Sequence, residues 1–159
     1  MRPQRINAII EMVSGSKEKY AFDAKTGKIT LKRVMNAPLP RPFNYGCLPN
    51  LKGGDGVELD VFVISSKPLR VGERIQVRPI GILHMTDEKG IDSKIVSVDL
   101  SDRRFNKARS IRQIDQAALQ NLRELVEHNK DGEKDKWVNV FGFADADSAI
   151  KSIVGAMSK

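Results

Sequence analysis

Two acidic segments carry the residue types and spacing in this chain that are best suited to chemistry. GGDGVELD contains Asp55, Glu58 and Asp60, and its glycines permit the sharp turn that brings carboxylates together. MTDEKGIDSK contains Asp87 and Asp92. Taken singly, each segment is also explained by ordinary turn chemistry. Several carboxylates in one place repel one another unless hard cations neutralise them, so the pair of segments predicts a site for divalent cations.

Isolated basic groups and a tyrosine complement these carboxylates. Ammonium, guanidinium and hydroxyl groups donate hydrogen bonds to phosphate oxygens, which suits a phosphate compound bound beside metal ions. Taken one at a time, the lysines are more simply explained as surface residues, and the tyrosine is equally explained as a core residue. The candidates are Lys19, Arg33, Tyr45, Lys94 and Lys130.

Short strands must position these residues over the first two thirds of the chain. Apolar or alternating runs predict strands at 6–13, 57–65, 73–85 and 94–100, and a hairpin from 20–23 and 28–34. The segment 36–50 holds four prolines and Gly46, so we expect an ordered loop there rather than a helix or a central strand.

The last third of the chain changes to a helical period. One set of apolar residues runs from Ile111 through Ile114 to Val126, and a second runs from Ala146 to Met157. A strand is predicted between them, at 136–143, and either Asp145 or Asp147 can cap the second helix. Short strands followed by two helices predict one mainly β domain over 1–159, a small closed barrel with helices outside it.

Composition narrows the classes of function. The chain has 159 residues, a net charge of +7 and a single cysteine, so it offers neither an internal disulfide nor a Cys/His zinc pattern. We find no signal peptide or membrane-spanning run, which predicts a cytoplasmic protein. The densest basic run is either a solvated surface or a nucleic-acid contact, and an aromatic content of 6% weakens the second reading. That run comprises Arg103, Arg104, Lys107, Arg109 and Arg112.

Several segments, in this order and spacing, resemble the soluble family I inorganic pyrophosphatases. They are IIEM (9–12), KY (19–20), FNYGCLPN (43–50), DGVELD (55–60), RPIGILHMTDE (78–88), DSKIVSV (92–98) and HNKDGEKDKWV (128–138). The resemblance covers nearly the whole chain. It implies a five-stranded closed barrel of the OB type with two flanking C-terminal helices.

The resemblance also implies a function and a role for each site residue. It implies an enzyme that hydrolyses inorganic pyrophosphate to two phosphates with several Mg²⁺ ions, Mn²⁺ being an alternative. Asp55, Asp60 and Asp92 match ligands of a tight metal pair, Asp87 a ligand of substrate-borne metal, and Glu11 an outer acid. Lys19, Arg33, Tyr45 and Lys130 match phosphate contacts, and Glu88 and Lys94 match positions that tune the acids.

Five positions depart from the family pattern. Val57 stands where the family has the aspartate that orients the attacking water and accepts its proton, and valine can do neither. The other departures are Ala21 for an acid, Lys32 for an aspartate, and Arg41 and Asn129 for tyrosines. These changes predict a divergent and slower pyrophosphatase. Glu58 either compensates in part or merely occupies a position where the family accepts glutamate.

Three other functions stay open at this point. One is a catalytically silent protein that binds phosphate or takes part in an assembly, and another is action on a larger phosphate ester contacted by Arg41. The third, nucleic-acid binding through the basic run, is the least favoured. The family match also implies a homo-oligomer, because His128 and Asp131 match contact positions, although Glu124 stands where a histidine is common.

Overall fold

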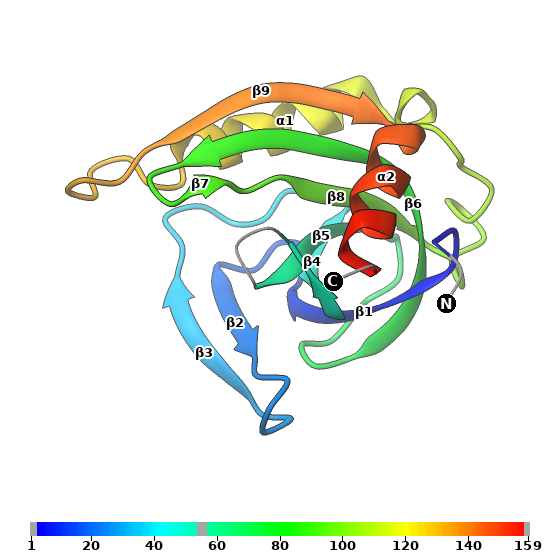
Figure 1. The fold of residues 1–159 in the computed structure, drawn as a ribbon, viewed down its shortest axis with the longest axis horizontal. Helices are drawn as coiled ribbons and strands as arrows, with labels where there is room; N and C mark the ends of the chain where they lie inside the picture. The colour runs from blue at the N-terminus through cyan, green and yellow to red at the C-terminus, as the bar shows by residue number, and fades with distance from the viewer. Residues whose placement is uncertain (1–2, 54–56, 158–159) are drawn as a thin grey trace.

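Five strands form a closed ring in the computed structural model, which describes residues 3–53 and 57–157. The hydrogen-bonded order runs β1, β4, β5, β8, β6 and back to β1 (Figure 1). The bounds are Ile6–Met12 for β1, Phe43–Lys52 for β4, Glu58–Ile64 for β5, Arg74–Asp87 for β6 and Lys94–Asp99 for β8. The β5–β8 pair is parallel and the other pairs are antiparallel. The predicted five-stranded barrel is confirmed.

The remaining elements lie around this ring. β2 (Glu18–Phe22) and β3 (Ile29–Val34) form a separate two-stranded sheet, hereafter the hairpin, as predicted. β9 (Val138–Asp145) pairs with β6, and the two-residue strand β7 (Gly90–Ile91) pairs with the end of β6. The helices are α1 (Gln116–His128) and α2 (Ala146–Met157), and Figure 1 shows α1 along β9 and α2 across the ring. Within the described residues, neither helix is long and apolar enough to cross a membrane.

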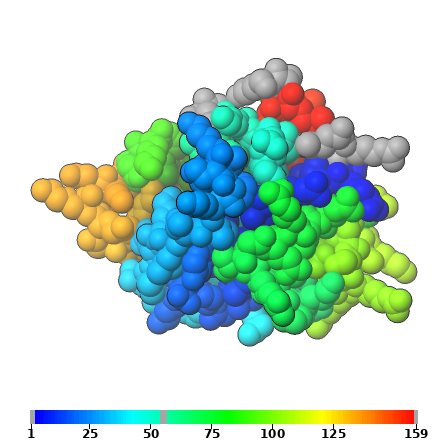
Figure 2. Space-filling view, turned by 90° about the horizontal axis from the view of Figure 1, so that it is seen from below, coloured from blue at the N-terminus to red at the C-terminus, as the bar shows by residue number. Residues whose placement is uncertain are grey.

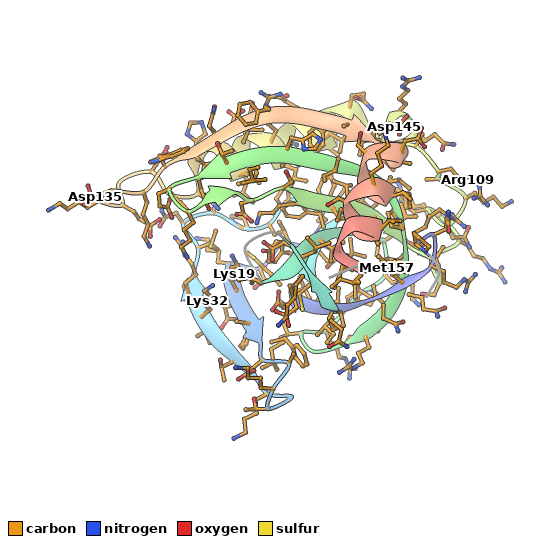
Figure 3. All side chains as sticks on the ribbon, in the orientation of Figure 1. Lys19, Lys32, Arg109, Asp135, Asp145 and Met157 are labelled. Carbon is orange, nitrogen blue, oxygen red and sulfur yellow. The ribbon has the colours of Figure 1, made fainter. Side chains whose placement is uncertain are left out.

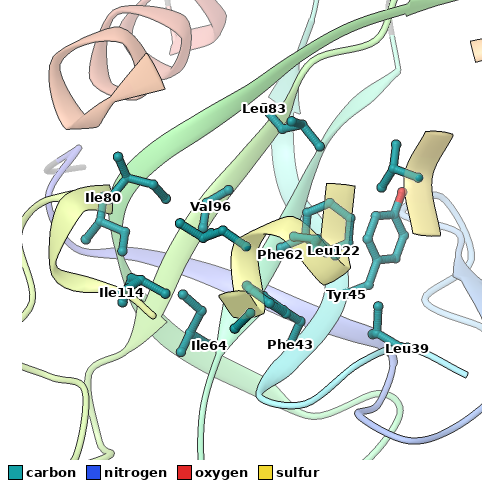
Figure 4. Close-up of a cluster of buried hydrophobic side chains, with 14 of the residues drawn as sticks. Leu39, Phe43, Tyr45, Phe62, Ile64, Ile80, Leu83, Val96, Ile114 and Leu122 are labelled. Carbon is teal, nitrogen blue, oxygen red and sulfur yellow. The ribbon is translucent and has the colours of Figure 1, made fainter. Parts of the chain in front are cut away.

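Strand alternation divides the buried residues into two cores. In β5, for example, Phe62 and Ile64 belong to one core, while Val61 and Val63 belong to the other. The first core is covered by α1 through Leu122 (Figure 4), and the second is closed by the apolar face of α2. Because each strand contributes to both cores, both of its faces are buried and it reads as a nearly continuous apolar run.

The prediction of a loop over 36–50 is wrong from Phe43 onward. β4 begins at Phe43 and pairs with both β1 and β5, which makes it a central strand. Three of the four prolines precede the strand, and Pro49 lies where the register with β5 shifts between Leu48 and Lys52. A proline without an N–H group is tolerated at such an irregularity. Gly46 permits close approach to β1, since a Cβ there would lie 2.0 Å from the carbonyl oxygen of Ile9.

The first predicted helix begins later than its apolar spacing suggests. Ile111 lies in a single 3₁₀ turn, residues 111–113, and Ile114 is extended, so α1 starts only after its N-cap, Asp115. Ser110 and Gln113 form a capping box at the start of this turn. At the second helix, Asp145 accepts the first N–H group, from Ala146, at 2.8 Å.

A buried aspartate ties β5 to the chain after β8. The Asp102 side chain, 4% exposed, accepts hydrogen bonds from the backbone N–H of Ser66 at 2.6 Å and of Arg104 at 3.0 Å. It also accepts from the Ser66 hydroxyl at 2.9 Å. Burial alone would raise the pKa of Asp102, but these donors hold it below its ordinary value.

We expect Asp102→Asn to lower the free energy of unfolding by about 2–3 kcal/mol at neutral pH, because hydrogen bonds to a charge are lost. The folded pKa of Asp102 is depressed, so its contribution is present above the unfolded pKa of about 4 and is lost as pH falls through the folded value. Urea unfolding of both proteins at several pH values checks this. A difference that stays constant into the acid range would contradict it.

Candidate active site

A single cavity of about 1010 Å³ brings the predicted site residues together. The nine of them that lie within the described residues all line it, although they come from segments far apart in the chain. They are Glu11, Lys19, Arg33, Tyr45, Asp60, Asp87, Asp92, Lys94 and Lys130. The tenth, Asp55, lies outside the described residues.

The parallel pairing of β5 with β8 places Asp60 beside Lys94. Val61 is opposite Ile95, so the residues before them, Asp60 and Lys94, are neighbours at one end of the two strands. The Lys94 Nζ atom lies 2.7 Å from Asp60 Oδ2 and 3.1 Å from Asp92 Oδ2. One buried ammonium group therefore joins the two acidic segments.

The charges of this cluster are interdependent. Burial alone would raise the pKa of Asp60, but Lys94 and the Tyr45 hydroxyl hold it below its ordinary value. Burial raises the pKa of Asp92, because its lysine partner offsets only part of the cost of desolvation. Burial would lower the pKa of Lys94, yet Asp60 and Asp92 raise it, so this lysine stays charged.

A second lysine holds the acids at the end of β6. The Lys130 Nζ atom lies 3.1 Å from Asp87 Oδ2 and 2.9 Å from Glu88 Oε2. Burial would lower the pKa of Lys130, but Glu88 and Asp87 raise it. Glu88 also accepts the backbone N–H of Trp137 at 3.2 Å, which fixes the chain after α1 against β6.

The hairpin and β1 supply the next groups. Burial raises the pKa of Glu11 to about 7, although its carboxylate accepts the Phe22 N–H at 2.7 Å. Burial lowers the pKa of Lys19 to about 8, with Lys94 adding to the shift. The Lys19 ammonium lies 4.9 Å from the centre of the Tyr45 ring. Desolvation also raises the pKa of Tyr45 well above its ordinary value, so its hydroxyl remains a donor.

Arg33 connects the hairpin to the segment that follows α1. Its guanidinium donates a hydrogen bond to the carbonyl oxygen of Asn129 at 3.4 Å, and it lies 3.6 Å from Glu133 Oε2. Figure 2 shows the hairpin (blue) at the front of the molecule, with the segment after α1 (orange) to its left. The cavity is thus bounded by the ring on one side and by the hairpin and this segment on the other.

Comparison with known proteins shows the family of the chain. A model of the family "Inorganic pyrophosphatase" matches residues 8–159. The chain belongs to the inorganic pyrophosphatase family. It is 38% identical to the inorganic pyrophosphatase of Sulfolobus acidocaldarius over 99% of this chain and 92% of that protein, and 36% identical to that of Xylella fastidiosa over 99% and 90%.

Solved structures of this family share the fold. The inorganic pyrophosphatase of Helicobacter pylori superposes with a TM-score of 0.92 at 31% identity, covering 99% of this chain and 94% of that one. The enzyme from Thermus thermophilus gives 0.91 at 33% identity, covering 98% and 91%. The resemblance first seen in the sequence motifs is therefore confirmed.

Four of the five positions that the sequence predicts to depart from the family pattern face the cavity. Ala21, Lys32, Val57 and Asn129 line it, and Figure 3 shows Lys19 and Lys32 on the two strands of the hairpin. Arg41 is not among the lining residues, and its guanidinium lies instead against Gly15, where an added Cβ would be 3.3 Å away. The structure therefore gives no support to a phosphate ester contacted by Arg41.

Sequence reasoning missed three charged residues of the cavity wall, Lys89, Glu133 and Lys136. Glu133 and Lys136 lie inside the motif HNKDGEKDKWV, in which the family resemblance implies a phosphate contact only for Lys130. The high density of charged residues in that motif was the one sequence feature that could have indicated them. The spacing of these residues does not show which side chains face the cavity.

The donor set suits Mg²⁺, which prefers carboxylate oxygens. Asp60, Asp87, Asp92 and Glu11 all line the cavity. Across the described ranges, 3–53 and 57–157, no three His, Cys, Asp or Glu side chains converge closely enough to form a ready metal cluster. Lys94 and Lys130 instead hold these aspartates in ion pairs.

The residues of the basic run 103–112 do not line the cavity. Its five arginines and lysines are exposed, and Figure 3 shows Arg109 pointing away from the molecule. Exposure is compatible with a solvated surface and with a nucleic-acid contact alike.

Proposed function

We propose that this protein hydrolyses inorganic pyrophosphate to two phosphates with the help of several Mg²⁺ ions, Mn²⁺ being the alternative. The observation that supports the proposal is one cavity, in a member of the pyrophosphatase family, lined by carboxylates and by lysine and arginine side chains. Asp55, Asp60 and Asp92 would hold a metal pair, Asp87 a substrate-borne ion, and Glu11 would act as an outer acid.

The chain's own groups have distinct tasks in this proposal. Bound Mg²⁺ would lower the pKa of a water ligand and offset the charge of the substrate. Lys19, Arg33, Lys130 and the Tyr45 hydroxyl donate to phosphate oxygens, and the lysines and the arginine also supply positive charge. Lys94 keeps Asp60 and Asp92 close together, so both carboxylates face the same point of the cavity.

The proposed enzyme is slower than relatives that carry an aspartate at the position of Val57. Val57 lines the cavity and is 58% exposed, and its side chain offers no group that accepts a proton. General base catalysis contributes about 10²–10⁴-fold, so electrostatic stabilisation and metal activation can still support slow turnover.

The same valine favours a second candidate, a catalytically silent protein that binds phosphate in this cavity. The cationic side chains of the wall would hold phosphate without any need for a base. Nucleic-acid binding through the exposed basic run remains the least favoured candidate, on the grounds of the low aromatic content of the chain.

Assembly and location remain predictions. The positions matched to oligomer contacts are His128 and Asp131. The His128 Nδ1 atom lies 2.7 Å from Asp131 Oδ2, and both side chains are exposed. A homo-oligomer in the cytoplasm is expected on the grounds of the family match.

One experiment distinguishes the two candidates. Purified protein is mixed with pyrophosphate and Mg²⁺, orthophosphate is measured over time, and pyrophosphate binding is followed on the same sample by calorimetry. Phosphate release above the uncatalysed background supports hydrolysis. Binding without release supports the silent alternative, and the absence of both contradicts each of them.

A further inference from the structure

Glu133 places a negative charge between two cations of the cavity wall. Its Oε2 atom lies 3.6 Å from the Arg33 guanidinium, and its Oε1 atom lies 3.9 Å from the Lys136 Nζ atom. Arg33 comes from the hairpin, whereas Glu133 and Lys136 belong to the segment after α1. All three residues line the cavity.

The contacts of Glu133 are electrostatic rather than hydrogen-bonded. Both separations exceed hydrogen-bond length. The Oε2 atom is buried and has no hydrogen-bond partner among the described residues. The ion pairs of Lys130 are shorter, since Asp87 and Glu88 lie 2.9–3.1 Å from its Nζ atom. Among the carboxylates of the cavity wall that pair with Arg33, Lys130 or Lys136, Glu133 therefore has the longest ion-pair distances.

A carboxylate bridging two cations resembles a phosphate group in charge and in donor requirement. Guanidinium and ammonium groups that face a carboxylate can face phosphate oxygens instead, with more oxygens to accept their N–H groups. A phosphate entering between Arg33 and Lys136 would meet Glu133 as a like charge at close range, which is unfavourable.

We infer that Glu133 is an internal competitor of phosphate, occupying Arg33 and Lys136 in the free protein and giving way when a phosphate group of the substrate binds. This inference rests on the proposed function, because it assigns Arg33 to phosphate binding. Glu133 thus lowers the affinity of this part of the cavity for phosphate. Its ion pair with Arg33 links the hairpin to the segment after α1 until the substrate displaces the Glu133 carboxylate.

The test measures binding of inorganic phosphate, without divalent metal, by calorimetry. Glu133→Gln keeps the shape of the side chain and removes its charge, and we expect the Kd for phosphate to fall about two- to fivefold, the range of a partly exposed ion pair. Glu133→Ala is expected to shift the Kd in the same direction. In an Arg33→Gln background, the fall in Kd caused by Glu133→Gln should be smaller, because only Lys136 then remains for the carboxylate to occupy.

Asp135→Asn is the matched control, because it removes one negative charge from the same segment. Asp135 does not line the cavity, lies at the far end of its loop (Figure 3) and has a φ of 61°, which asparagine tolerates. A Kd that is unchanged or higher in Glu133→Gln, or that falls equally in Asp135→Asn, overturns the inference. Phosphate binding needs no turnover, so this outcome is independent of whether the native protein hydrolyses pyrophosphate.

Discussion

Replacing Asp60 with alanine is expected to lower kcat for pyrophosphate hydrolysis by at least about 10³-fold at saturating Mg²⁺. Asp60 combines a place in the proposed metal pair with direct contact to Lys94 and to the Tyr45 hydroxyl. Its loss would remove a metal ligand and leave Lys94 paired only with Asp92. Steady-state phosphate release in the native and variant proteins measures the effect.

Asp60→Asn separates charge from packing in this prediction. The amide oxygen can still accept from Lys94, but it ligates Mg²⁺ far less well than a carboxylate does. We expect both variants to lose activity while their melting temperatures show that the fold persists. A native-like rate in either variant would contradict the assignment of Asp60 to the metal pair.

The barrel was predictable because its strands are short apolar runs buried on both faces. The run containing Val61 and Val63 is an example, and the structure places it as β5. The failure at β4 also has a physical cause: three prolines precede the strand, and Pro49 falls at its irregular end. Propensity read one residue at a time cannot show that the neighbouring strands adapt to a missing N–H group.

The start of α1 illustrates a similar limit. Ile111 and Ile114 fit a helical period and do pack in the same core as α1, yet they lie outside the helix. The helical spacing of apolar residues indicates which residues face the same core, whereas the capping residues decide where the helix begins. The pattern gave the core correctly and the boundary incorrectly.

The membership of the cavity was predictable from motif positions, but its ion pairs were not. The motifs named Lys94 and Lys130 as site residues, and the structure adds that each holds two acids. Which cation meets which anion depends on the parallel register of β5 and β8 and on the path of the chain after α1. Neither is encoded in local spacing, so the role of Glu133 emerged only from the structure.

Restoring an acid at position 57 is the second prediction with a large effect. Val57→Asp is expected to raise kcat about 10²-fold, within the range that a positioned general base contributes. Val57 already lines the cavity and is exposed, so an aspartate fits without disturbing the core. Measurements of kcat and KM at saturating Mg²⁺ should place the gain in kcat, because the base acts on the attacking water rather than on substrate binding.

Val57→Asn is the control, since it has the shape of aspartate but cannot accept the proton. A gain in Val57→Asp alone identifies the missing base as the limiting defect, whereas an unchanged rate refutes that idea. Glu58→Gln in the native background tests whether Glu58, which also lines the cavity, compensates in part. If it does, the rate of the native protein should fall with this substitution, and the gain from Val57→Asp should persist in the double variant because the new carboxylate makes Glu58 dispensable.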